Sequence, residues 1–354
     1  MKRMRTKIIS FVLSGLLLLF AGSCDKQDEY TTSPTANFEA LWKIMDEHYC
    51  FFGYKDIDWD EVYNRYRLQV KDTMNQYQLF DVLGKMLAEV KDGHTNLISP
   101  FNVARYWKWY EDYPKNFSEQ ILDNYLGTDY LIASGMKYTV FPKGGSSSLP
   151  SGVSALLKDS VGYIYYESFS SGVGQTNLDY VLYYFRNCKG LIIDVRNNGG
   201  GAITYSDRIA SRFTDKRILS GFIQYKTSPA HDAFSEPYPV YLESSDRIQW
   251  YRPVVVLTNR RCYSATNDFI NKMKLMPNVK VIGDRTGGGS GFPFYSELPN
   301  GWSVRFSACP MLNAEKEDTE FGIDPDKFVS MLADDEKKGE DTIINEAIRL
   351  LCED

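Results

Sequence analysis

The chain has 354 residues, of which 43% are hydrophobic and 24% are charged, and its formal net charge is −6. This composition is ordinary for a globular domain, and the length allows one large domain or a main domain with a smaller one attached. No basic cluster interleaved with aromatic residues occurs, which excludes nucleic acid as an expected partner.

Residues 1–23 predict an export signal that is not part of the fold. The basic start "MKRMRTK" is followed by the apolar run "IISFVLSGLLLLF", which is short for a membrane span, and by small residues before Cys24. The segment "FAGSC" resembles the lipobox of bacterial lipoproteins, with Ala21 where leucine is usual. This resemblance implies a lipid on Cys24 and a membrane-attached protein of the cell envelope, outside the cytoplasm. Plain secretion is the alternative.

The mature chain would carry no basic patch to help it bind a membrane. Loss of residues 1–23 removes four basic residues and no acidic one, which moves the net charge from −6 to −10. The acyl chain on Cys24 would therefore be the anchor, and the polar residues 24–36 would be the tether.

Apolar residues then recur at helical spacing through "NFEALWKIMDEHYCFF", "DWDEVYNRYRLQV" and "NQYQLFDVLGKMLAEV". Asp58 and Gln76 stand near the expected starts of the second and third helices. We therefore expect a small N-terminal helical unit over residues 37–100, which ends in "KDGHTNLISP".

Residues 101–160 are expected to be an aromatic-rich connecting region. The aromatic side chains of "FNVARYWKWYEDYPKNF" either line a carbohydrate or peptide surface or pack in a core, and "PKGGSSSLPSG" predicts a loop. The sequence leaves the role of this region open.

Residues 161–354 predict an α/β domain. "VGYIYYESF", "GLIIDV", "PVVVLTN" and "VKVIG" are typical of strands, and "ITYSDRIASRF" and "SATNDFINKMKLM" of helices. This alternation favours a parallel sheet with right-handed crossovers. The loops "RNNGGG" and "RRCYSA" each follow an apolar strand, so they lie at the same sheet edge if those strands are neighbours.

Ser264 stands at the start of the helix that follows "RRCYSA". It is either an N-cap of that helix or a nucleophile near the helix dipole. The Gly-rich turn "RNNGGG" can aim backbone N–H groups at an oxyanion, although alone it could also be a phosphate-binding loop. The chain has three histidines. His48 falls inside a helix, His231 in a loop, and His94 in a turn that could direct it into a cleft.

Taken together, "KDGHT", "GLIIDVRNNGGG", "TNRRCYSATNDF" and "VIGDRTGGGSGF" resemble the C-terminal-processing (tail-specific) serine peptidases over residues 37–100 and 160–330. The resemblance implies a Clp/crotonase-like α/β catalytic domain behind a helical unit, with Ser264 as nucleophile. In the processing branch a lysine is the base, but Gly289 occupies the matching position. The resemblance therefore points to the tricorn-core-like branch, in which His94 is the base.

In that branch a glutamate orients the histidine through a neighbouring serine. Glu320 of "TEFGIDPD" matches the glutamate, and Asp318 is the alternative because the spacing is one residue short. Gly93 replaces the serine, and Thr95 could take its place. The orienting contact to His94 is thus an expectation that the structure must test.

The resemblance implies peptide-bond hydrolysis through an acyl-enzyme on Ser264, with a peptide or protein as substrate. Gly200 and Ala265 would supply the oxyanion hole, and Gly199 is the alternative donor. No metal ion and no organic cofactor is expected. Residues 101–160 are too short for a complete PDZ module, so recognition of a free C-terminus is not implied.

Two other functions remain open on the same scaffold. The first is a non-catalytic peptide- or apolar-ligand-binding protein, as in the related repeats of interphotoreceptor retinoid-binding proteins. The second is crotonase-like acyl-CoA chemistry, which export would separate from CoA. The joint presence of Ser264, His94, an acid near residue 320 and "NNGGG" favours the peptidase.

Overall fold

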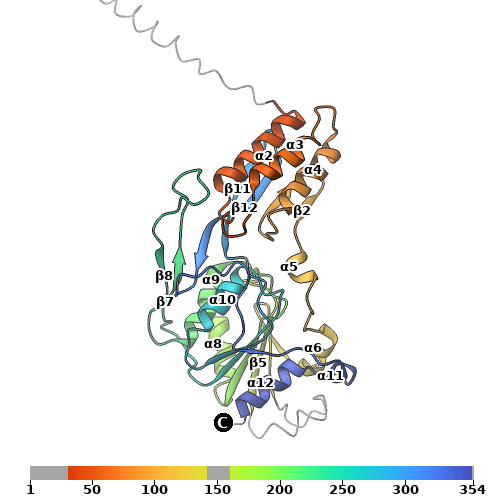
Figure 1. Cartoon of the computed structure of the whole chain (residues 1–354). Helices are drawn as coiled ribbons and strands as arrows, with labels where there is room; N and C mark the ends of the chain where they lie inside the picture. The colour runs from red at the N-terminus through yellow and green to blue at the C-terminus, as the bar shows by residue number, and fades with distance from the viewer. Residues whose placement is uncertain (1–30, 142–159, 353–354) are drawn as a thin grey trace, which may run out of the picture.

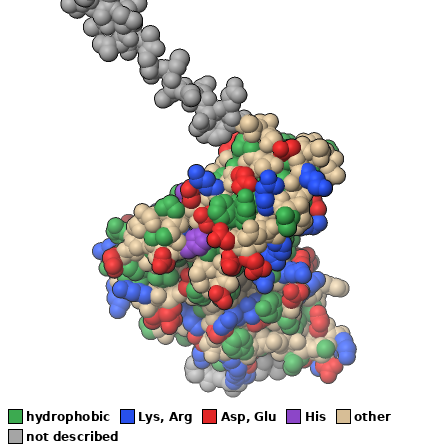
Figure 2. Space-filling view, turned by 45° about the horizontal axis from the view of Figure 1, so that its top comes forward, with side chains coloured by type: hydrophobic (Ala, Val, Ile, Leu, Met, Phe, Trp, Pro, Cys, Tyr) green, Lys and Arg blue, Asp and Glu red, His purple; other side chains and the backbone are tan. Residues whose placement is uncertain are grey.

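The computed structural model describes residues 31–141 and 160–352. The predicted signal, Cys24 and the loop "PKGGSSSLPSG" lie outside the described residues. Figure 1 shows helices α2–α4 at one end of the molecule and a large sheet with its helices at the other. Acidic and basic side chains are interspersed on the face seen in Figure 2. Within the described ranges, no helix combines the length and the apolar character that crossing a membrane requires.

The described helices fall before, between and after the strands. They are α2 (Pro34–His48), α3 (Trp59–Arg67), α4 (Gln76–Ala88), α5 (Lys108–Glu111), α6 (Glu119–Leu126), α8 (Gln175–Tyr184), α9 (Ile203–Ala210), the 3₁₀ helix η1 (Ser211–Phe213), α10 (Ala265–Met273), α11 (Ala333–Lys337) and α12 (Thr342–Cys352). The strands are β1 (Asn96–Ile98), β2 (Val103–Arg105), β3 (Leu131–Ala133), β4 (Met136–Phe141), β5 (Val161–Tyr166), β6 (Gly190–Asp194), β7 (Ile218–Ile223), β8 (Tyr238–Leu242), β9 (Val254–Thr258), β10 (Val279–Gly283), β11 (Gly291–Glu297), β12 (Ser303–Leu312) and β13 (Lys327–Phe328).

The predicted helix starts are confirmed by side-chain caps. Asp58 accepts a hydrogen bond from the backbone N–H of Glu61 at 2.9 Å, which caps α3. Asn75 and Gln78 form a reciprocal capping box at the start of α4, with both contacts at 3.0 Å. Each cap satisfies backbone N–H groups that the first helical turn leaves without partners.

The large sheet has seven strands in the order β13-β10-β9-β6-β5-β4-β3. Strands β10, β9, β6 and β5 are parallel neighbours, as the sequence predicted. Every residue of β6 and β9 is buried, because helices α8, α9 and α10 cover one face and α6 and α12 the other. Strands buried on both faces are the expected result of continuous apolar runs such as "GLIID" and "VVVLT".

The boundary predicted at residue 160 cuts through this sheet. Strand β4 pairs with β5 in antiparallel register from Met136↔Tyr166 to Phe141↔Val161, and β3 extends the edge. Part of the predicted connecting region therefore belongs to the α/β domain. The two strands continue the sheet beyond β5, whose six residues are all buried.

The second sheet has six strands and joins the two ends of the molecule. Its order is β2-β1-β12-β7-β8, and β11 also pairs with β12. The β11–β12 hairpin packs Trp302 and Phe306 into the core of helices α2–α4, beside Phe38 and Leu83. The N-terminal helices thus bury their apolar faces only with the help of a hairpin from residues 291–312, so the unit predicted at residues 37–100 is not closed on itself.

Candidate active site

Neighbouring strands β6 and β9 bring the two predicted loops together. Ile193 pairs with Val256 in parallel register, so the loops that follow both strands lie at the same edge of the sheet. A Cβ on Gly200 would lie 2.6 Å from the carbonyl oxygen of Tyr263 and 2.8 Å from the Cβ of Ser264. Only glycine permits this approach, and Gly200 also has a φ of +98°.

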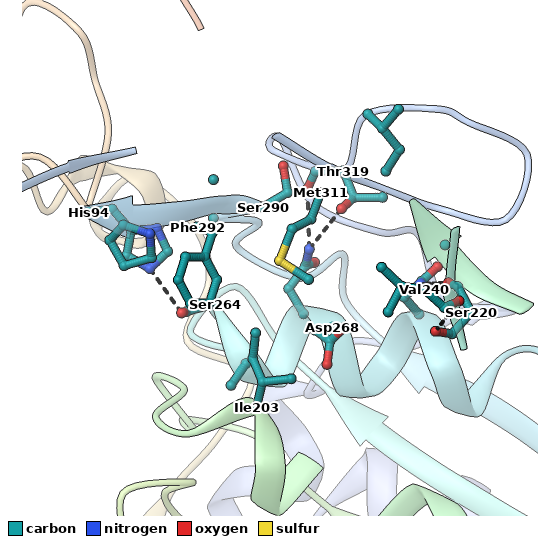
Figure 3. A pocket seen from close by; sticks show the side chains of 18 of the residues that line it. His94, Ile203, Ser220, Val240, Ser264, Asp268, Ser290, Phe292, Met311 and Thr319 are labelled. Atoms are coloured by element: carbon teal, nitrogen blue, oxygen red, sulfur yellow. Dashed lines mark hydrogen bonds between the residues drawn. The ribbon is translucent and has the colours of Figure 1, made fainter. Parts of the chain in front are cut away.

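Ser264 precedes α10 but does not cap it. Its backbone has φ 59° and ψ −121°, and its side chain accepts no hydrogen bond from the helix. The hydroxyl instead lies 2.9 Å from Nε2 of His94 (Figure 3). A non-glycine residue at positive φ costs roughly 1–3 kcal/mol and is typical of functional sites. The capping alternative is therefore wrong for this serine.

His94 comes from the turn after α4, at the end of the helical unit. Only 4% of its surface is exposed, and its backbone N–H donates to Oδ1 of Asp92 at 2.7 Å. This Asx turn fixes the backbone that directs the ring toward Ser264. The other two histidines lie elsewhere, since His48 ends α2 and His231 contacts Asp46 at 2.8 Å.

The surroundings of His94 keep its imidazole neutral at pH 7. Burial lowers its pKa to about 4, Asp92 opposes this shift, and Arg305 adds to it. The neutral ring accepts the Ser264 hydroxyl proton on Nε2 when Nδ1 carries the hydrogen. Nδ1 is buried and has no partner in hydrogen-bond geometry among the described residues. The backbone of Gly291 faces the ring and favours its protonated form.

The predicted contact between Glu320 and His94 is absent. Oε1 of Glu320 accepts a hydrogen bond from Nζ of Lys55 at 2.8 Å, and Oε2 accepts from the backbone N–H of Ser290 at 2.9 Å. Asp318, the alternative, accepts from the Ser290 hydroxyl at 3.0 Å. Lys55 and Glu320 have side-chain exposures of 4% and 3%. Glu320 therefore holds the buried ammonium by a hydrogen bond, and the nearby Asp92 carboxylate contributes a stabilising charge.

These acids differ in how firmly they hold a proton. Burial raises the pKa of Glu320 to about 8 and that of Asp318 to about 6. Burial would also raise the pKa of Asp92, but Lys55 and His94 keep it below its usual value. Asp92 is therefore the ionised carboxylate beside His94.

The structure leaves no space at position 93 for the serine that the tricorn-like pattern carries there. A Cβ there would lie 2.7 Å from Nε1 of Trp109 and 3.0 Å from the hydroxyl of Tyr263. Thr95 is not the substitute either, because its hydroxyl points to Oδ2 of Asp92 at 3.3 Å. The space that an orienting serine would need is occupied by the side chains of Trp109 and Tyr263, so no serine connects an acid to the histidine.

The prediction that the Gly200 N–H is an oxyanion-hole donor is wrong. The N–H of Gly200 donates to Oδ1 of Asn198 at 3.0 Å, so it is already occupied. Asn198 also accepts from the Thr266 hydroxyl at 2.7 Å, which fixes the amide in place. Ala265 is the first residue of α10, so its N–H has no partner within the helix. The Gly199 N–H has no acceptor among the described residues, which makes Gly199 the second donor that the geometry favours.

Sequence reasoning missed Asp92, Lys55 and Trp109. The Asp-x-His spacing in "KDGHT" was a signal for Asp92, because an Asx turn places the carboxylate over the backbone of the residue two positions on. Lys55 follows the aromatic run "CFFGY", of which Phe51 and Phe52 are buried, and that context hinted at a buried ammonium. Nothing local indicated the partner of Lys55.

Two pockets open on either side of Ser264 and His94. The first, shown in Figure 3, has a volume of about 330 Å³ and is largely apolar; its lining includes Ile203, Phe222, Val240, Phe292 and Met311. The second has a volume of about 370 Å³ and is basic and aromatic; its lining includes Arg105, Trp107, Tyr110, Arg261 and Arg305. A polypeptide crossing Ser264 would reach both pockets.

Residues 160–329 match peptidase family S41, and residues 30–88 match the tricorn protease C1 domain. The chain is also 64% identical to a candidate peptidase from Parabacteroides merdae ATCC 43184, over 91% of this chain and 97% of that one, and the two folds superpose with a TM-score of 0.82. The chain belongs to peptidase family S41. The family resemblance and the α/β fold class inferred from the sequence are thereby confirmed.

Two more distant proteins are also similar to this S41 protein, one in fold and one in sequence. The structure of mature CPAF superposes with a TM-score of 0.67 at 12% identity, over 91% of this chain and 97% of that one. A protein of Chlamydia trachomatis serovar D is 25% identical over 128 residues, which are 34% of this chain. That match spans 21% of the curated relative's own length.

Proposed function

We propose that this S41 protein hydrolyses peptide bonds through an acyl-enzyme formed on Ser264. The observation that carries the proposal is the 2.9 Å contact between Oγ of Ser264 and Nε2 of His94. His94 takes the hydroxyl proton as Oγ attacks the scissile carbonyl, and it then protonates the leaving amine. The N–H groups of Ala265 and Gly199 stabilise the oxyanion, and water attacks the acyl-enzyme in the second half of the reaction.

Asp92 stabilises the imidazolium that forms in each half-reaction. It is the buried ionised carboxylate that holds the backbone of His94, and its charge raises the pKa of the ring. Arg305 and Lys55 act in the opposite direction. Asp92 thus has the electrostatic role that the sequence assigned to an acid near residue 320.

Glu320 is a positioning residue in this proposal. Its carboxylate accepts from the Ser290 N–H, and its carbonyl accepts from the Gly289 N–H at 3.2 Å. These contacts hold the segment that ends in Gly291, whose backbone faces His94. Glu320 therefore affects the ring through the loop and not by contact.

Labelling with a fluorophosphonate tests the proposal without a guess about substrate. The purified mature protein should form one adduct, which peptide mass spectrometry locates on Ser264. Ser264→Ala should abolish the adduct, and His94→Ala should slow labelling by about 10²-fold or more. His231→Ala is the matched control, since His231 lies outside the site, and it should label like the wild type. Absence of an adduct while a known serine peptidase labels in parallel would overturn the proposal in favour of ligand binding.

We also propose that the protein is exported and anchored through a lipid on Cys24. The export signal and the lipobox-like "FAGSC" support this proposal. Protein expressed from the full chain should partition into the detergent phase and carry an acylated N-terminal Cys24 by mass spectrometry. Cys24→Ala should move it to the aqueous phase. Membrane partitioning of Cys24→Ala equal to that of the wild type would refute the anchor.

A further inference from the structure

The basic pocket beside Ser264 contains three arginines and no acidic residue. Arg105, Arg261 and Arg305 line it, and among the described residues no Asp or Glu does. None of the three forms an ion pair with a described carboxylate. A local concentration of unpaired cations is unusual on a chain whose formal net charge is −6.

Two of these arginines lie over aromatic rings. Arg105, at the end of β2, lies over Trp107 at 5.6 Å from the ring centroid. Arg261 lies over Tyr110 at 4.4 Å. Stacking of this kind orients a guanidinium while leaving its N–H edge available for an anion.

Arg305 lines both pockets. It projects from β12, and its Nε is buried without a hydrogen-bond partner among the described residues. A buried N–H donor without an acceptor is costly, so a ligand that supplies an acceptor there gains binding energy. The guanidinium fork matches a carboxylate in shape and charge.

We propose that this pocket binds a carboxylate of the substrate peptide while Ser264 attacks a bond nearby. The proposal rests on the peptidase function proposed above, because Ser264 and His94 form part of the lining of the same pocket. The bound carboxylate therefore belongs to the chain that is cut. It is either an Asp or Glu side chain close to the scissile bond or the free C-terminus of the peptide.

The bound carboxylate would also strengthen the base. The charge of Arg305 is one of the causes that hold the pKa of His94 below its usual value. An anion against Arg305 offsets that charge. Peptides that carry the carboxylate should therefore have a higher kcat as well as a lower KM. A pocket that only captured peptides would change KM alone.

Paired peptides test the proposal. One set has Glu or Gln at each position on both sides of the cleaved bond, and a second set has a free or an amidated C-terminus. The wild type should cleave the carboxylate form of one set with a kcat/KM about tenfold or more above its neutral partner, and the set that responds identifies the source. In Arg305→Gln and in the Arg105→Gln/Arg261→Gln double variant, this ratio should fall toward one.

The matched control is Arg186→Gln. Arg186 also stacks on a tyrosine, at 4.2 Å from the ring of Tyr183, but it is not among the residues that line the pocket, so its ratio should equal that of the wild type. Equal cleavage of carboxylate and neutral peptides by the wild type would overturn the carboxylate site and leave the peptidase intact.

Binding to Ser264→Ala, followed by fluorescence anisotropy, separates the two proposals. Preferential binding of the carboxylate peptides that weakens with salt would support the site even if the wild type cut nothing. Equal binding of carboxylate and neutral peptides would overturn it.

Discussion

The space beside Gly93 gives the sharpest test of how the active site is built. A Cβ at this position would lie 2.7 Å from Nε1 of Trp109 and 3.1 Å from Cζ of Tyr263. Trp109 stacks on Tyr263 with ring centroids 4.1 Å apart. Tyr263 is buried and directly precedes Ser264, whereas Trp109 is only half-buried, so Trp109 is the ring that must move.

We expect Gly93→Ala to cost roughly 1–3 kcal/mol of stability, the usual range for a core group added without space. It should also slow fluorophosphonate labelling of Ser264 by about tenfold or more, because a small displacement of neighbouring groups disturbs the contact between Ser264 and His94. In a Trp109→Ala background the nearest obstacle is gone. The stability cost of Gly93→Ala should then fall by about 1–2 kcal/mol, which is the coupling energy of the pair.

Urea unfolding of the wild type, both single variants and the double variant measures this coupling. Gly53→Ala is the matched control, because a Cβ there meets no atom within 4 Å, and it should leave stability and labelling nearly unchanged. The reasoning fails if Gly93→Ala and Trp109→Ala add to within about 0.5 kcal/mol, the agreement expected of independent sites.

Four further predictions concern the same site. Because the pKa of His94 is lowered to about 4, the rate of fluorophosphonate labelling should decrease at acidic pH with a midpoint near pH 4. A midpoint at the ordinary histidine pKa of about 6.5 would contradict the assignment of His94 as the base. Asp92→Asn should slow labelling and move this midpoint to lower pH, since the Asp92 charge favours the protonated ring. Because the folded-state pKa of Glu320 is raised to about 8, the folded protein binds more protons than the unfolded chain, and stability is lost as the pH rises toward 8. Between about pH 6.5 and 8, Glu320→Gln should lose up to about 2 kcal/mol less stability than the wild type does. Urea midpoints that change with pH in the variant as steeply as in the wild type would refute this prediction. Asn198→Ala should lower kcat by about tenfold or more by loosening the turn that presents Gly199, and an unchanged kcat on any cleaved peptide would count against that turn as the oxyanion loop.

Local patterns were enough to predict the sheet, whereas the family resemblance was needed to select Ser264 and His94 from the candidates that those patterns left open. The apolar runs of β6 and β9 determine their burial, and burial on both faces favours adjacent parallel strands. The positions of Ser264 and His94 follow from turns that directly succeed a strand and a helix. Such turns depend on neighbours in sequence, so one sequence was sufficient to find the candidate positions.

The contacts that tune the pair could not be predicted in this way. Lys55 and Glu320 are 265 residues apart in sequence, and nothing near either one shows that both side chains are buried. The occupied N–H of Gly200 depends on the rotamer of Asn198, which the Thr266 hydroxyl fixes from the first turn of α10. These contacts arise only from tertiary packing, and they decided the two assignments that the structure changed.

The placement of the buried contact between Lys55 and Glu320 follows from the division of the site between the two ends of the molecule. His94 belongs to the turn after α4, whereas Ser264 directly precedes α10, so their 2.9 Å contact depends on the relative position of the two ends of the molecule. The pair between Lys55 and Glu320 crosses the same boundary, and Nζ of Lys55 also donates to the carbonyl of Val90 at 3.2 Å, a few residues before His94. A hydrophobic contact would be at least as stabilising, but it would tolerate sliding. The directed hydrogen bonds of a buried ammonium hold one register, and one register is what the proposed catalytic contact across this boundary requires.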